Sequence, residues 1–166
     1  VYKRQTVTST AVTSATEDAV YTYTLTAADA DVGDTLTFSG TTVPSWLTFT
    51  ASTGVLTGTP TNDNVGTTGN AVVLTVTDAA GESVTDSFTI TVANTNDAPT
   101  ISSTAVVSVD EDSAYSYTTT ASDVDAGDTV TLTCTTFPNW MTCTAGALTG
   151  TPTNDHVGDW NVVITA

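Results

Sequence analysis

An internal repeat constrains this chain more than any other feature. Four blocks return in the same order 92 to 94 positions later: EDAVYTY (17–23) as EDSAYSY (111–117), DADVGDT (29–35) as DVDAGDT (123–129), PSWLT (44–48) as PNWMT (138–142), and LTGTPTND (56–63) as LTGTPTND (148–155). Four ordered matches predict two copies of one module rather than a single larger domain. We therefore place the first domain at residues 1–95 and the second at residues 96–166.

Each copy has the length and the side-chain alternation of a β-sandwich. Tyr21, Tyr23 and Leu25 alternate with threonines, and turn sequences such as DVGD and DAAG separate the alternating runs. We predict seven strands in the first copy, at residues 6–13, 20–27, 34–39, 47–50, 55–57, 71–77 and 83–92. Trp46 and Trp140 are predicted to pack between the sheets, with a sugar-stacking platform as the alternative.

The second copy stops early. Residues 162–166 correspond to residues 72–76 of the first copy, so the last strand, residues 83–92, has no counterpart. An open groove and a bare apolar edge are expected. Either the natural chain continues with its own last strand, or the N-terminal segment of a neighbouring chain, residues 6–12, completes the sheet. The second arrangement, repeated head to tail, predicts a filament subunit that polymerises by strand donation.

The charge balance excludes several classes of function. The chain carries 18 acidic and 2 basic residues, a formal net charge of −16, and both basic residues lie within the first four positions. Such a surface cannot displace the counterions of nucleic acid, and it is repelled by anionic lipid. No apolar run approaches the roughly 18–20 residues of a membrane span. A hydrophobic content of 39% separates the chain from acidic disordered proteins.

The acidic residues are predicted to gather at strand ends and at the junction of the two copies. The junction set is Glu17, Asp63, Asn94, Asn96, Asp97, Asp123, Asp125 and Asp128. With no Lys or Arg nearby, these oxygens predict a Ca²⁺ site, because Ca²⁺ accepts about 6–8 oxygen ligands. The alternative is that these residues only form turns.

A second acidic set is predicted at the opposite end of the first copy. Its members are Asp29, Asp31, Asp34 and Asp78. We expect weaker Ca²⁺ binding there, because Tyr2 and Lys3 stand where the junction has Asn96 and Asp97. Lys3 or Arg4 is expected to neutralise part of this set.

No catalytic set emerges from the sequence. His156 is the single histidine and is expected in a solvated loop, and the acids follow the repeat rather than forming a hydrolytic pair. Cys134 and Cys143 flank the connection between two consecutive strands of the second copy. They predict a disulfide between facing positions on neighbouring strands, with two buried thiols as the alternative.

Several segments together carry a family resemblance: LTAADAD (25–31) followed by Gly33 and Asp34, PSWL (44–47), TGVLTGTP (53–60) and NDAP (96–99). The chain resembles the dystroglycan-type cadherin-like repeats of bacterial surface proteins. The resemblance implies an all-β chain of two tandem immunoglobulin-like, cadherin-like Greek-key sandwiches, the second lacking its last strand. It also implies calcium between successive domains.

In that family's pattern the ligands come from four places. Glu17 takes the role of the Glu after the first strand. Asn96 and Asp97 take the linker role, and Asp123 and Asp125 that of the Asp-x-Asp in the next domain. Asp63 stands at the position of the acidic motif after the fifth strand, where the sequence TNDN departs from the family.

The resulting expectation is a non-enzymatic, extracellular or cell-surface module, a calcium-stabilised rod segment of an adhesin or fibre. Its expected partners are other copies of the repeat or neighbouring chains. The alternatives are the strand-donating filament subunit and a carbohydrate-binding module. For the last, Trp160 is the best candidate, because the first copy has no aromatic residue at that position.

Overall fold

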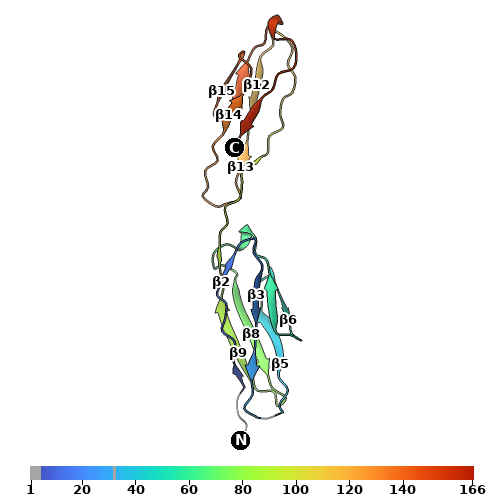
Figure 1. Cartoon of the computed structure of the whole chain (residues 1–166), viewed down its shortest axis with the longest axis vertical. Helices are drawn as coiled ribbons and strands as arrows, with labels where there is room; N and C mark the ends of the chain where they lie inside the picture. Colours follow the sequence, from blue (N-terminus) through green and yellow to red (C-terminus); the bar gives the residue numbers. More distant parts are fainter. Residues whose placement is uncertain (1–4, 32) are drawn as a thin grey trace. The chain divides into compact units, whose positions relative to one another are not determined.

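The computed structural model describes residues 5–31 and 33–166, and it divides into two compact units, Val1–Thr95 (unit 1) and Asn96–Ala166 (unit 2). In the described residues the regular structure is β-strand apart from one short 3-10 turn in each unit (Figure 1). The protein is all-β. Each unit is an immunoglobulin-like, cadherin-like Greek-key sandwich, and the described residues 96–166 include no counterpart of the last strand of the first.

The described residues of unit 1 form ten short strands and the 3-10 turn η1. They are β1 (Thr6–Val7), β2 (Ser14–Thr16), β3 (Tyr21–Thr24), β4 (Ala27–Ala28), β5 (Thr37–Thr42), β6 (Leu47–Thr50), β7 (Val55–Gly58), η1 (Asn62–Asn64), β8 (Ala71–Thr77), β9 (Ser83–Thr89) and β10 (Thr91–Ala93).

The strands of unit 1 pair in two layers. One layer holds the antiparallel order β3–β7–β6, and β1 pairs with β4. The other holds the antiparallel order β5–β8–β9, and β10 pairs in parallel with β2. Because successive side chains on a strand face opposite ways, every second residue of these strands points between the layers.

Those inward side chains form the core of unit 1. Its buried apolar members are Tyr21, Tyr23, Leu25, Leu47, Leu56, Val72, Leu74, Val76, Ile90 and Val92. Trp46 packs against this core, edge-on to Tyr21 at 5.8 Å, and its Nε1 donates to Oδ1 of Asn70 at 2.9 Å. Core packing, rather than a sugar platform, is therefore the role of Trp46.

The strand boundaries differ from the seven predicted segments. Residues 47–50 and 71–77 are strands as predicted. The single strand predicted at 6–13 is wrong, because β1 pairs with β4 and the chain then changes partner so that β2 pairs with β10. The predicted segment 83–92 also divides at Ile90. The Ile90 N–H still donates to the carbonyl of Asn70, the next position of the β8–β9 register, but the N–H of Thr91 donates to Thr13, and β10 then pairs with β2.

Unit 2 contains seven strands and the 3-10 turn η2. They are β11 (Thr100–Ile101), β12 (Tyr115–Thr118), β13 (Ala121–Ser122), β14 (Thr133–Thr136), β15 (Met141–Thr144), β16 (Ala147–Gly150), η2 (Asn154–His156) and β17 (Val163–Thr165).

Unit 2 repeats part of the topology of unit 1. The order β12–β16–β15 reproduces β3–β7–β6, with Tyr115 opposite Gly150 as Tyr21 is opposite Gly58. The pair β14–β17 reproduces β5–β8. Within the described part of unit 2, no strand corresponds to β2, β9 or β10.

The repeated sequence Leu-Thr-Gly-Thr-Pro has a steric reason. A Cβ on Gly58 would collide with the carbonyl oxygen of Trp46, and one on Gly150 would collide with that of Trp140. Each glycine therefore lets its strand approach the backbone beside the core tryptophan, so both copies keep it.

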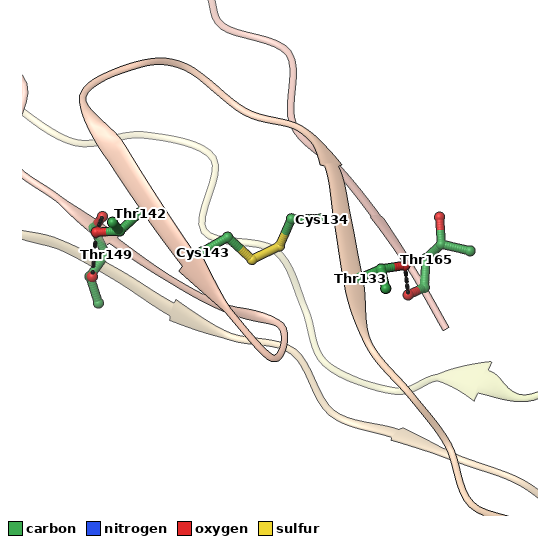
Figure 2. Close-up of a disulfide and its surroundings, with 6 residues drawn as sticks. All are labelled: Thr133, Cys134, Thr142, Cys143, Thr149 and Thr165. Atoms are coloured by element: carbon green, nitrogen blue, oxygen red, sulfur yellow. Dashed lines mark hydrogen bonds between the residues drawn. A yellow bond between two sulfur atoms is a disulfide. The ribbon is translucent and has the colours of Figure 1, made fainter.

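A disulfide joins Cys134 on β14 to Cys143 on β15, with 6.4 Å between their Cα atoms (Figure 2). These strands belong to different sheets of unit 2, so the bond links the two layers rather than neighbours within one sheet. In unit 1 the same positions are Gly40 and Phe49, and the Phe49 ring lies against Gly40. A covalent link in unit 2 thus replaces an aromatic contact in unit 1.

Candidate metal centres

Three carboxylates meet at one end of unit 1. Asp29 follows β4, Asp34 precedes β5 and Asp78 follows β8, and one carboxylate oxygen from each lies within 4.8 Å of the others. Asp78 is buried, and its Oδ1 accepts the N–H of Glu82 at 2.9 Å. The predicted ligand Asp31 lies in the same loop but is not a member of this group.

The Asp29 carboxylate shows what this group lacks. Its Oδ1 accepts the N–H of Asp31 at 2.8 Å, which is the turn role that any Asp can fill. Its Oδ2 is buried and has no hydrogen-bond partner among the described residues. A buried carboxylate oxygen without a partner is costly, and two further carboxylates nearby add repulsion. Turn formation alone therefore does not explain the group.

The donor set fits a hard cation. All three side chains offer carboxylate oxygens, and no Lys or Arg occurs anywhere from Gln5 to Ala166. Ca²⁺ takes oxygen ligands in flexible geometry, whereas Mg²⁺ demands a near-ideal octahedron and keeps several waters. The predicted contact of Lys3 or Arg4 with this group lies outside the described residues.

The matching loop of unit 2 forms a second group. Asp123, Asp125 and Asp128 bring one carboxylate oxygen each to within 4.8 Å of the others. The N–H of Asp125 donates to Oδ1 of Asp123 at 2.9 Å, as in the first loop, and Gly127 supplies the left-handed turn with φ of 101°. Asp125 is 5% exposed, although its counterpart Asp31 is half-buried.

The linker residue Asp97 explains the burial of Asp125. Its backbone N–H donates to Oδ2 of Asp125 at 2.7 Å, so this segment folds onto the Asp-x-Asp loop of its own unit. Asn96 is exposed and donates from its side chain to the carbonyl of Asp97 at 2.7 Å. Unit 2 thus brings together four of the predicted junction residues: Asp97, Asp123, Asp125 and Asp128.

The remaining predicted ligands belong to unit 1. Glu17 is 3% exposed, and its Oε2 accepts the N–H of Thr95 at 3.2 Å. Asp63, in η1, and Asn94 are both exposed. The adjacent Asp18 has a left-handed backbone with φ of 58°, and its N–H bonds the carbonyl of Pro60, so its conservation between the copies has a backbone reason.

His156 is not the solvated loop residue that the sequence suggested. It is half-buried between Trp140 and Trp160, with ring centroids 6.3 and 6.2 Å away. Its Nδ1 lies 3.1 Å from the backbone N of Thr153 and accepts its proton, as Oδ1 of Asn64 does from Thr61 in unit 1. The signal was present in the sequence, because the repeat aligns His156 with the capping residue Asn64.

Trp160 does not form a flat aromatic platform. It is 47% exposed, but its ring stands at 65° to that of His156, and its Nε1 donates to the His156 carbonyl at 2.7 Å. Sugar binding usually needs an accessible, uncluttered aromatic face. The arrangement therefore gives no support to the carbohydrate-binding alternative.

Comparison with known proteins matches both repeats. The family described as "Putative Ig domain" matches residues 4–93 and again residues 98–166. The chain is 34% identical over 143 residues to the "Serine-rich adhesin for platelets" of Staphylococcus aureus strain USA300. The aligned region covers 85% of this chain. It spans only 6% of the length of that relative.

Solved structures of cadherin domains share the fold. Human protocadherin-24 domains EC1-2 superpose with a TM-score of 0.56 at 18% identity, covering 91% of this chain and 80% of that one. Protocadherin gamma B2 cadherin domains 3-6 superpose with a TM-score of 0.55 at 16% identity, covering 97% and 42%. Among the described residues no helix has both the length and the apolar character to cross a membrane.

Proposed function

Because the chain belongs to the Putative Ig domain family, we propose that it is a non-enzymatic structural repeat of an extracellular adhesive protein, held stiff by Ca²⁺. Within that family we assign it to the dystroglycan-type cadherin-like repeats. The similarity to a staphylococcal adhesin supports the surface location and the adhesive role. The similarity to cadherin domains supports a load-bearing tandem arrangement whose partners are other copies of the repeat.

The observation that carries the calcium proposal is the buried, unpartnered Oδ2 of Asp29 beside Asp34 and Asp78. A cation at this group would supply the missing partner and offset the repulsion of three carboxylates. The ion's contribution is electrostatic: it binds ligands that only the folded loops bring together, so it stabilises the folded state.

A second ion is proposed for the acidic group of unit 2. Its ligands are the predicted residues Asp97, Asp123, Asp125 and Asp128. The hydrogen bond from the Asp97 N–H to Oδ2 of Asp125 supports the inclusion of this linker residue in the set. The ion would hold the first segment of unit 2 against its own Asp-x-Asp loop.

Calcium titration of metal-free protein tests the proposal. We expect calorimetric binding, a higher melting temperature, and reversal of both by a chelator. Asp125→Asn keeps an acceptor for the Asp97 N–H but removes a charge, so it should weaken the site of unit 2 at least tenfold. Asp29→Asn should weaken the site of unit 1 in the same way.

The matched control is Asp155→Asn, an exposed residue of η2 outside both acidic groups. It removes the same charge, so it should lower Ca²⁺ affinity only slightly. Equal losses in Asp125→Asn and Asp155→Asn would reduce the effect to net charge. An unchanged melting temperature with and without Ca²⁺ would overturn the proposal.

A further inference from the structure

The open edge of strand β5 is a feature of unit 1 that the metal proposal does not use. In the β5–β8–β9 sheet β8 is the central strand, so β5 and β9 form the two edges (Figure 1). The edge at β9 lies against β1, and the Gln5 side chain there donates to the carbonyl of Glu82 at 2.6 Å. At the other edge, the backbone of residues 37–42 makes hydrogen bonds to β8 alone among the described residues.

Strand β5 also lacks most of the features that keep an edge strand from pairing with another chain. Edge strands are commonly protected by charged side chains, by proline, by a covering segment or by a β-bulge. The sequence of β5 is TFSGTT, with neither a charge nor a proline, and all of its residues except Phe38 are exposed. Its one irregularity lies between Gly40 and Thr42, so residues 37–40 pair regularly with β8 and present a regular edge.

The charge of unit 1 is kept away from this edge. Apart from Asp86, every acidic residue of unit 1 lies outside its strands, and Asp86 on β9 accepts the Tyr23 hydroxyl at 2.6 Å. Two copies of a chain with a formal net charge of −16 repel each other wherever their carboxylates approach. Contact through an uncharged edge strand brings the fewest carboxylates together, so β5 is a place where a second copy can approach.

The outward side chains of β5 suit a strand of the same sequence. Thr37, Ser39 and Thr41 carry hydroxyls, and a hydroxyl both donates and accepts a hydrogen bond. A row of hydroxyls is therefore complementary to itself, whereas a row of carboxylates is not. The sheet already contains such a contact, because the hydroxyls of Thr41 and Thr75 lie 3.0 Å apart across β5 and β8. Cross-strand pairs of this kind stabilise antiparallel strands.

We propose that β5 is the surface through which unit 1 pairs with unit 1 of a second copy of this chain. The inference rests on the proposed function in one respect, since it names the contact surface for the partners proposed there. The two β5 strands lie antiparallel about a two-fold axis, so that the two β5–β8–β9 sheets join into one continuous sheet. The hydroxyls of Thr37, Ser39 and Thr41 then face those of the second copy.

The position of the nearest carboxylate decides the strand direction. Asp34 precedes β5 by three positions. Antiparallel pairing about Ser39 sets Asp34 beyond the far end of the second copy's β5, opposite an uncharged residue. Parallel pairing in register would set the two Asp34 side chains beside each other, and like charges directly opposite on neighbouring strands are destabilising.

The size of the contact sets its strength. A six-residue edge is about 20 Å long, and the two sheets of a sandwich lie about 10 Å apart. The resulting contact is well below the roughly 800 Å² that each partner buries in a stable dimer. We therefore expect a weak dimer that forms at high chain concentration and weakens at low salt, where the repulsion between the chains is screened least.

Charge reversal at Ser39 tests the proposal. Sedimentation equilibrium in about 0.15 M salt, with a chelator present, should show dimerisation of the chain as its concentration rises. Ser39→Asp and Ser39→Lys each bring like charges together across the two-fold axis, so each variant alone should dimerise at least tenfold more weakly. An equimolar mixture of the two variants should recover the dimer, because opposite charges then face each other.

The matched control is Thr85 on β9. Ser39, Thr75 and Thr85 stand in one row across the sheet, and Thr85 is exposed at the edge opposite β5. Thr85→Asp and Thr85→Lys make the same changes of net charge and should leave dimerisation unchanged. Ser39 is also exposed, so all four variants should keep the melting temperature of unit 1.

Hydrogen exchange detects the strand pairing directly. The β5 amide protons that point away from β8 should exchange readily in the monomer and become protected at concentrations that give the dimer. The amide protons of β6, the edge of the other sheet, should keep their exchange rates.

Four results would overturn the proposal. These are a chain that stays monomeric at every concentration, Ser39 variants that dimerise as the parent chain does, a mixture of the two Ser39 variants that stays monomeric, and equal losses in the Thr85 variants. The last result would place the contact on the outer face of the sheet rather than at its edge. Because the chelator removes Ca²⁺ throughout, each of these results leaves the calcium proposal to its own titration.

Discussion

Thr119 occupies the core position that Leu25 holds in the other unit, as the repeat aligns them. Its side chain is 5% exposed, and its hydroxyl is buried without a hydrogen-bond partner among the described residues. A buried hydroxyl in that state costs stability, whereas a methyl group of the same shape does not.

Thr119→Val should therefore raise the free energy of unfolding of unit 2 by about 1 kcal/mol. Denaturant titration measures this change in the free energy of unfolding from the unfolding transition of unit 2. The reciprocal change Leu25→Thr should destabilise unit 1 by about 2–4 kcal/mol, because it removes apolar volume and buries a hydroxyl. A loss of stability in Thr119→Val would show that the hydroxyl has an acceptor.

Two core tyrosines make unit 1 sensitive to alkaline pH. Burial raises the pKa of Tyr21 to about 12, and burial together with the hydrogen bond to Asp86 raises the pKa of Tyr23 to about 12, against an ordinary value of 10. The folded unit thus holds its phenolic protons more tightly than the unfolded chain does.

The stability that these protons contribute is fully present below pH 10 and is lost as pH rises toward 12. We expect the denaturation midpoint of unit 1 to fall across that interval. Tyr23→Phe should reduce the slope, since it removes one of the two groups. A midpoint that stays constant from pH 9 to pH 12 would contradict the assigned pKa shifts.

The acidic loops show how far single residues can be predicted from sequence. The repeated pattern Asp-x-Asp-x-Gly-Asp located both carboxylate groups, because closely spaced acids in one turn must lie near one another. Asp78 was found because it ends a strand at the same edge. The unpartnered oxygen of Asp29 could not be predicted, since it depends on which atom of the side chain is covered. The cap formed by His156 could be predicted only through the repeat, which aligns it with Asn64.

At the scale of elements, alternation predicted strands well where turns enclose them and poorly where a strand changes partner. Strands β6 and β8 have their predicted bounds because each pairs along its whole length. Residues 6–13 are predicted as one strand, yet pairing there passes from β4, opposite Thr6 and Val7, to β10, where the N–H of Thr91 donates to the Thr13 carbonyl. Periodicity records which face is buried, not which neighbour supplies the hydrogen bonds.

The disulfide offers a test at this scale. It closes a short loop, since Cys134 and Cys143 are separated by nine in the sequence, and it ties β14 to β15 across the two layers. Loop-closure entropy predicts a contribution of about 2–3 kcal/mol. Reduction, or the double change of Cys134→Ala and Cys143→Ala, should lower the melting temperature of unit 2.

Unit 1 is the internal control for that experiment, because Gly40 and Phe49 occupy its matching positions and no cysteine lies in it. Its transition should not move under reducing conditions. If both transitions shifted together, the effect of the reductant would have to be ascribed to something other than this bond.

At the scale of the whole molecule, the two units share a sequence pattern but not a complete core. Ten buried apolar residues form the core of unit 1, whereas Tyr115 and Leu148 are the buried large apolar residues found in the described part of unit 2. Because apolar burial is the main stabilising term in folding, the two copies should differ in stability despite their shared sequence pattern.

Differential scanning calorimetry should therefore show two transitions, with unit 2 unfolding at the lower temperature. The disulfide stabilises unit 2 and so reduces the difference between the two melting temperatures. A reductant should increase that difference by lowering the transition of unit 2 alone. The Leu56→Ala and Leu148→Ala variants assign the transitions, since both side chains are fully buried and each belongs to one unit. Each should lower its own transition through a core loss of about 2–5 kcal/mol. A single transition that both variants shift equally would show that the units unfold as one cooperative body, and unequal cores would then no longer determine which copy opens first.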